Sequence, residues 1–214
     1  MEFAWDAADG AQHNFSHASF LHQRGLYVAA VPFAELDGGD EDLGVQMMAL
    51  TSWLDLLFKC KVKHVVCLAD DEELWRRHAG LGDGDLAATC RGQGFSFHHT
   101  PLHEEWPSAS ALADALAAIR RTPPSQTEGV AIVGADGREV AATVAVAWLV
   151  LHCEEDAAKA VRAVEGSAKE VGASRAPLAP FTRAIDAGGD AAADGAAEQG
   201  LADLIEQARQ LLSG

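Results

Sequence analysis

Residues 130–143, VAIVGADGREVAAT, are the stretch that decides the fold. The stretch begins as a short apolar strand, continues through a loop with two glycines, and enters an Ala/Val-rich helix. This order is typical of a phosphate cradle, because backbone N–H groups of the loop and the first helical turn converge on an anion. Asp136 and Glu139 lie in this loop. The sequence therefore predicts the shape of a phosphate site, with charges in it that repel a phosphate.

Other apolar runs extend this unit into a sheet with helices between its strands. Strands are predicted at residues 25–33, 63–70, 94–102 and 129–134. The run at 63–70 is continuously apolar and bounded by charge, as in a strand that is buried on both faces. Helices are predicted at residues 42–58, 85–91, 109–121, 140–151 and 156–164. This alternation predicts an α/β fold, with a central, mostly parallel sheet flanked by helices on both faces.

Two of these helices have informative apolar patterns. Residues 140–151 are apolar nearly all round, which predicts a central, buried helix. Residues 42–58 carry a stripe at helical spacing that consists of Leu43, Met47, Leu50, Leu54 and Phe58.

The chain divides into four parts over its 214 residues. We expect an N-terminal extension at residues 1–15 and one α/β domain at residues 16–185. Residues 186–200, DAGGDAAADGAAEQG, lack large apolar side chains and predict a flexible linker. Residues 201–214 predict an amphipathic helix that docks on the domain or on a partner. Its apolar face consists of Leu201, Leu204, Ile205, Ala208 and Leu212.

Charge and cysteine content exclude several classes of function. The net charge of -16 argues against unaided binding to nucleic acid or to an anionic membrane. The four cysteines contain no CxxC pair, so their spacing fits neither a zinc site nor a disulfide framework. The acidic N-terminus does not resemble a signal peptide, and the longest apolar run is too short to span a bilayer. We therefore expect a cytoplasmic or nuclear protein.

A metal site and a nucleotide site are both weakly indicated. His98, His99, His103 and Glu104 lie close together, but adjacent histidines in a strand point to opposite faces, so no metal is expected. The turn Gly134–Gly137 lacks the third glycine of a dinucleotide fingerprint. Binding of a small molecule or nucleotide there is kept as an alternative, and no cofactor is expected.

Three stretches together resemble the dual-specificity class of cysteine-dependent protein phosphatases. They are FLHQRGLYVAAVPF, VVCLADDEELWRRHAGLGDGDLAATCRGQGFSFHHTPL and VAVAWLVLHCEEDAAKAV, within residues 20–185. The chain is most similar to kinase-associated phosphatase, of the cyclin-dependent kinase inhibitor phosphatase family. The resemblance implies an active site in the loop after the last parallel strand. That site has a cysteine nucleophile after a histidine, an arginine after five further residues, and an aspartate acid on a separate loop.

The resemblance implies that this chain lacks the catalytic residues. Gly134 occupies the nucleophile position, Val133 that of the histidine, and Val140 that of the arginine. Glu104 falls near the general acid. Arg138, the only cation in the loop, comes two residues early. The remnant of the phosphate loop comprises Val133, Gly134, Ala135, Asp136, Gly137, Arg138, Glu139 and Val140.

A second register within the same resemblance uses Cys153 as the nucleophile. His152, Cys153 and Lys159 imitate the signature with lysine in place of arginine. The intervening EEDAA has no glycine and three acids, which disfavours both a phosphate and a reactive thiolate, so we reject this register.

We therefore predict a pseudophosphatase, a scaffold or regulatory protein that binds a protein partner such as a kinase or phosphoprotein. The alternatives are an active protein tyrosine/serine/threonine phosphatase that uses Cys153, and a small-molecule or nucleotide-binding module.

Overall fold

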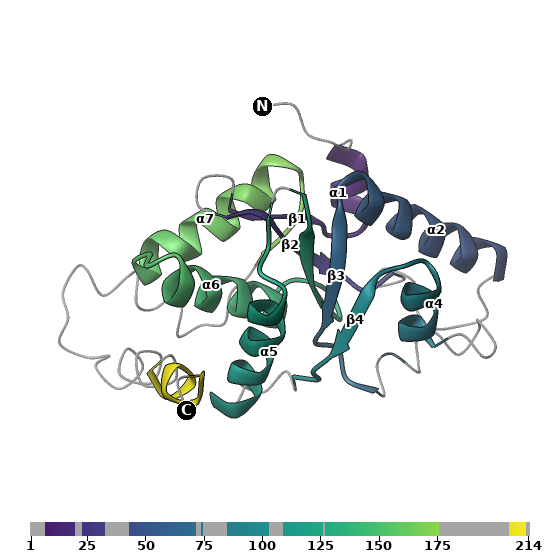
Figure 1. Ribbon diagram of the computed structural model, residues 1–214. Coiled ribbons are helices and arrows are strands. Elements are labelled where there is room, and N and C mark those ends of the chain that lie inside the picture. Colours follow the sequence, from purple (N-terminus) through teal and green to yellow (C-terminus); the bar gives the residue numbers. More distant parts are fainter. Residues whose placement is uncertain are drawn as a thin grey trace.

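A five-stranded sheet with helices on both faces forms the centre of the molecule (Figure 1). The computed structural model describes residues 7–19, 23–32, 43–71, 74, 85–102, 109–125, 127–175 and 206–212. The strands are β1 (Ser16–Ser19), β2 (Gln23–Ala30), β3 (Val62–Cys67), β4 (Ser96–His99) and β5 (Gly129–Gly134), in the order β1-β2-β5-β3-β4. β1 pairs antiparallel with β2, and the other pairs are parallel. The predicted α/β fold with a mostly parallel sheet is confirmed.

Alternating side chains of the strands supply two separate cores. One face, with Val130 and Ile132 of β5, packs against α5 (Ala109–Arg121), α6 (Val140–His152) and α7 (Ala157–Glu170). The other face, with Ala131 and Val133, packs against α2 (Leu43–Lys59) and α4 (Leu86–Gly92). All six residues of β5 are buried, as expected of the central strand of a doubly covered sheet.

Helix α6 is the buried helix that the sequence predicts. Its residues 141–149 are all buried, because the sheet, α5 and α7 surround it. Helix α7 is longer than expected and ends at Glu170. Asp156 caps α7, accepting hydrogen bonds from the N–H groups of Ala158 and Lys159 at 3.0 and 3.3 Å.

Two N-terminal elements were not predicted. They are α1 (Ala7–Gln12) and the edge strand β1, whose sequence SHAS has no large apolar side chain to reveal it. Phe15, between them, is fully buried, and its ring stacks on Tyr27 with centroids 5.1 Å apart. This packing joins the segment before β1 to the core under β2.

The C-terminal helix docks on the domain. Residues 206–212 are helical, Ala208 is fully buried against the α5–α6 core, and the Leu212 carbonyl accepts a hydrogen bond from Arg120 Nη1 at 3.1 Å. The expected linker at 186–200 and the expected general-acid loop, with His103 and Glu104, lie outside the described residues. Among the helices that the structure describes, none is both long and apolar enough to cross a membrane.

Candidate functional site

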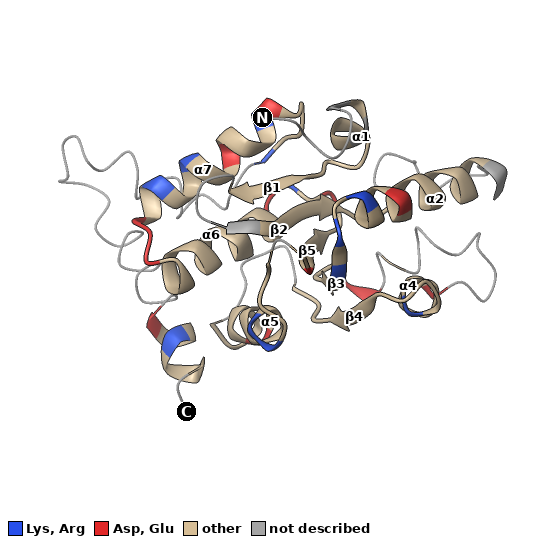
Figure 2. Ribbon diagram, turned by 45° about the horizontal axis from the view of Figure 1, so that its top comes forward, with Lys and Arg blue, Asp and Glu red and all other residues tan. Residues whose placement is uncertain are grey.

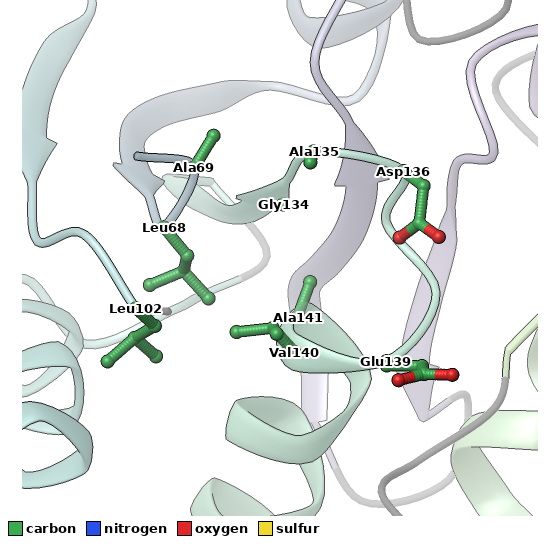
Figure 3. Close-up of a pocket in the computed structure, with 9 residues that line it drawn as sticks. All are labelled: Leu68, Ala69, Leu102, Gly134, Ala135, Asp136, Glu139, Val140 and Ala141. Carbon is green, nitrogen blue, oxygen red and sulfur yellow. The ribbon is translucent and has the colours of Figure 1, made fainter. Parts of the chain in front are cut away.

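An open hollow lies where β3 and β5 end and α6 begins (Figure 3). Its volume is about 200 Å³. In open parallel sheets, ligands bind at this carboxyl edge, so the hollow is the candidate site. The residues that line it are Leu68, Ala69, Leu102, Gly134, Ala135, Asp136, Glu139, Val140 and Ala141.

The loop between β5 and α6 is shaped by bonds within the protein. Asp136 Oδ1 accepts a hydrogen bond from the N–H of Arg138 at 2.7 Å, which closes a tight turn. Asn14 Nδ2 donates to the Asp136 carbonyl at 2.7 Å, which ties the turn to the segment before β1. Gly137 has φ of 68° and lies against the backbone of β2. Hydrogen bonds and packing within the protein therefore hold the curve of this loop.

Gly134 faces the start of α6, which is the arrangement that the resemblance implies for a nucleophile. A Cβ built on Gly134 would lie 3.6 Å from the Ala141 nitrogen and 3.7 Å from the Gly137 nitrogen. The first N–H groups of a helix have no partner within the helix, so they favour a negative charge at this point. A thiolate here would be stabilised, but Gly134 supplies no side chain.

Among the described residues that line the hollow, none is a lysine or arginine. Val140 points its side chain toward Leu68 and Leu102 and so extends the apolar wall of the hollow (Figure 3). Arg138 does not line this hollow. It lines a second one of about 150 Å³ on the other side of the loop, together with Asn14 and Ser174.

Asp136 and Glu139 give the hollow a negative rim. Both side chains are exposed, and neither forms an ion pair with a lysine or arginine in the described part of the chain. Two exposed carboxylates without such an ion pair among the described residues oppose an incoming phosphate.

None of the four cysteines lines the hollow. Cys60, Cys67 and Cys90 are buried, and burial raises the pKa of Cys90 to about 12. Cys153 is the C-cap of α6. A helix of this length spans about 18 Å, so Cys153 lies at the far end of α6 from the loop. Burial raises the pKa of Cys153, and the negative charge of nearby Glu155 raises it further by a smaller amount. A nucleophilic cysteine requires the opposite, a lowered pKa.

Alkylation by iodoacetamide measures the raised pKa of Cys153 directly. In the native protein, iodoacetamide should label Cys153 alone, with a pH midpoint above about 8.5, the value of an ordinary thiol. Mass spectrometry of the labelled protein across pH gives both the site and the midpoint. Rapid labelling of Cys153 near neutral pH would indicate a low-pKa thiolate and would revive the second register.

The histidines of β4 have separate environments. His99 Nε2 is 2.8 Å from the Ala69 carbonyl and its Nδ1 is 3.5 Å from Asp71, whereas His98 Nε2 is 3.2 Å from the hydroxyl of Ser96. Within the described ranges, no group of three or more His, Cys, Asp or Glu side chains is placed to hold a metal.

Arg175 supports the loop between β5 and α6 through Asn14, a role that no sequence pattern indicated. Its Nη2 donates to the carbonyls of Asn14 and Val28 at 2.7 Å and to Ser16 Oγ at 3.0 Å. Burial lowers its pKa to about 9 and nearby Asp136 partly offsets this, so the guanidinium stays charged at neutral pH. Arg175 thus fixes Asn14, which in turn holds the Asp136 carbonyl.

Comparison with known proteins shows which fold the chain shares with solved structures. No protein-family model and no curated protein matches the chain. Solved structures do match, among them a human tyrosine phosphatase-like serine/threonine/tyrosine-interacting protein, with a TM-score of 0.54 and 13% identity over 80% of this chain and 93% of that one. The chain has a phosphatase-like fold.

Two further structures share this phosphatase-like fold. DUSP15 has a TM-score of 0.51 and 14% identity over 90% of this chain and 94% of that one. PTPMT1, solved in complex with PI(5)P, has a TM-score of 0.50 and 14% identity over 82% of this chain and 99% of that one. In the phosphatase-like fold, the hollow at Gly134 is the place where the sequence resemblance puts the active site.

Proposed function

We propose that this chain is a catalytically inactive phosphatase-like protein that acts by binding a protein partner. One observation carries the proposal. Gly134 faces the N–H groups at the start of α6, where a nucleophile is needed, and provides no reactive atom there. The distance of Cys153 from the hollow and its raised pKa add support, because no other cysteine is accessible.

The electrostatics of the hollow support the same proposal. A phosphatase holds two phosphate oxygens with an arginine fork, and Val140 stands in that position. Arg138 contributes to a different hollow, and the rim carries Asp136 and Glu139. The hollow that the described residues line is also smaller than the 300–1,000 Å³ or so that is typical of small-molecule sites, which disfavours the small-molecule alternative.

A protein partner is the function that such a scaffold can still serve. One protein of the same fold is described as phosphatase-like and as interacting with serine/threonine/tyrosine, which is a precedent for the proposal. The resemblance of the sequence to kinase-associated phosphatase makes a kinase or phosphoprotein the first partner to test. Cyclin-dependent kinases are the first class within that group.

Binding of a phosphate analogue tests the proposal before any catalytic assay. The melting temperature of the protein should change by less than about 1 °C in millimolar orthovanadate or phosphate, because a ligand that does not bind the folded state does not stabilise it. Differential scanning fluorimetry measures this, with sodium chloride at equal ionic strength as the control. A saturable stabilisation of the wild-type protein by vanadate would contradict the proposal.

A further inference from the structure

Helix α2 carries most of the large apolar side chains that the described residues leave exposed. Four of the five such side chains belong to this one helix, and the fifth is Leu211 of the C-terminal helix. Met48 is 74% exposed, which is unusual for a side chain of this size. A cluster of exposed apolar residues on one element is typical of a contact surface for another molecule. The four are Val45, Met47, Met48 and Phe58.

The predicted apolar stripe of α2 is only partly used by the fold. Leu50 and Leu54 of this stripe are buried, together with Trp53, but Met47 and Phe58 are about half exposed. Met47 and Phe58 are eleven residues apart, about three helical turns, so they lie on one side of α2, whereas Leu54 is buried in the core. Helix α2 therefore packs one face on the sheet and presents a second stripe beside it.

Positive charge surrounds the end of this stripe. The ring of Phe58 packs on that of Phe95, with centroids 4.7 Å apart, which brings the end of α2 next to the segment that follows α4. Figure 2 shows basic residues at the end of α2 and the start of β3, and an acidic residue on α2 as well. The acid is the exposed Asp55, and three exposed cations lie within four residues of Phe58 or Phe95 in the sequence, in a chain whose net charge is -16. They are Lys59, Lys61 and Arg91.

We propose that this α2 surface binds an amphipathic helix of a protein partner that carries acidic residues beside its apolar stripe. The α2 surface consists of Met47, Met48 and Phe58 with Lys59, Lys61 and Arg91. Unbranched methionine side chains adapt to the partner, as in other surfaces that bind amphipathic helices. The cations select the partner by charge complementarity. The inference rests on the proposed function, because it gives the partner-binding role a surface.

Two other occupants fit the surface less well. A second copy of this chain would bring a surface with the same three cations, which repel one another. An anionic membrane would have to approach a molecule whose net charge is -16. An acidic helix satisfies both the apolar stripe and its basic end.

Two designed peptides test the α2 surface. Each has about 20 residues, long enough to form a helix, with leucines at helical spacing and either glutamates or lysines beside them. By fluorescence anisotropy, the labelled glutamate peptide should bind the full chain at least about tenfold more tightly than the lysine peptide. Lys59→Glu/Lys61→Glu/Arg91→Glu should reverse this preference. Lys159→Glu/Arg162→Glu, two exposed cations of α7, is the control and should not reverse it.

A separate double variant tests whether the apolar side chains of the α2 surface contribute to binding. Met48→Ser/Phe58→Ser should weaken binding of the glutamate peptide at least about tenfold. Because both side chains are exposed, thermal unfolding should show that the variant remains folded.

Several outcomes would overturn the inference. They are absence of binding, equal affinity for the two peptides, and a charge-reversed variant that keeps the original preference. Sedimentation of the chain with phosphatidylserine vesicles, if abolished by Met48→Ser/Phe58→Ser, would assign the surface to a membrane. A dimer in sedimentation velocity that the same variant dissolves would assign it to a second copy. If the peptides fail while vanadate gives no stabilisation, the surface is wrong and the inactive scaffold still stands.

Discussion

Replacing Arg175 by alanine is expected to lower the free energy of unfolding by about 3–5 kcal/mol, because buried and partly buried oxygen atoms lose a charged hydrogen-bond donor. Arg175 is 8% exposed. Its two terminal nitrogens donate to Ser174, Asn14, Ser16 and Val28 over distances of 2.7 to 3.0 Å. Ser174 lies in the segment after α7, Asn14 lies just before β1, and the other two acceptors lie in β1 and β2, so one side chain joins three parts of the fold.

Urea denaturation at neutral pH measures this loss as a shift in midpoint at constant slope. Arg175→Met keeps most of the volume of the side chain and should lose nearly as much stability as Arg175→Ala, since the hydrogen bonds are absent in both. Arg162→Ala, an exposed arginine of α7, is the matched control and should change the unfolding free energy by less than about 0.5 kcal/mol. A loss below about 1 kcal/mol in both Arg175 variants would show that the network does not hold these segments.

Gly137→Ala is expected to cost about 2–4 kcal/mol, because the new methyl group has no space and the backbone angle suits only glycine. The φ of Gly137 is 68°, and a Cβ there would lie 2.5 Å from both the Ala29 carbonyl carbon and the Ala30 nitrogen. Those atoms are backbone of β2 and cannot rotate away. Either the loop or the edge of the sheet must therefore shift.

Gly134→Ala is the matched control in the same loop. Its Cβ would meet the Ala141 side chain at 3.2 Å, a tight contact that a small shift relieves, so stability should stay within about 1 kcal/mol of the wild type. Thermal or urea unfolding of both variants measures the difference. If the two substitutions cost the same, the account of how the fold holds the loop is wrong. The expected contrast means that packing against β2, rather than a bound phosphate, maintains the curve of the loop.

The elements of the central sheet could be predicted from sequence because their patterns are strong. β5 and α6 are apolar almost throughout, and such segments are expected to be buried on all sides, as both are here. β1 gave no such signal, since SHAS pairs at an edge through its backbone rather than through large side chains. The stripe on α2 was recognised, but local spacing does not reveal that Leu50 meets the sheet while Phe58 stays half exposed.

The resemblance led to the candidate site, which stays a prediction, but not to the residues that hold its loop in place. The resemblance placed Gly134 and Val140 in the loop after the last parallel strand, where the structure has them at the hollow. Arg175 and Asn14 were missed because they contact one another across more than 150 residues of sequence. Long-range hydrogen bonds of this kind leave no periodic or motif signal.

Turnover of an aryl phosphate is the measurement that tests the central claim most directly. The intact protein and Cys153→Ser should both release nitrophenolate from p-nitrophenyl phosphate no faster than buffer, with an active cysteine-dependent phosphatase as the positive control. This follows because Gly134 offers no nucleophile and Cys153 lies at the other end of α6. Saturable turnover by the wild type that Cys153→Ser abolishes would contradict the account and make the chain an enzyme.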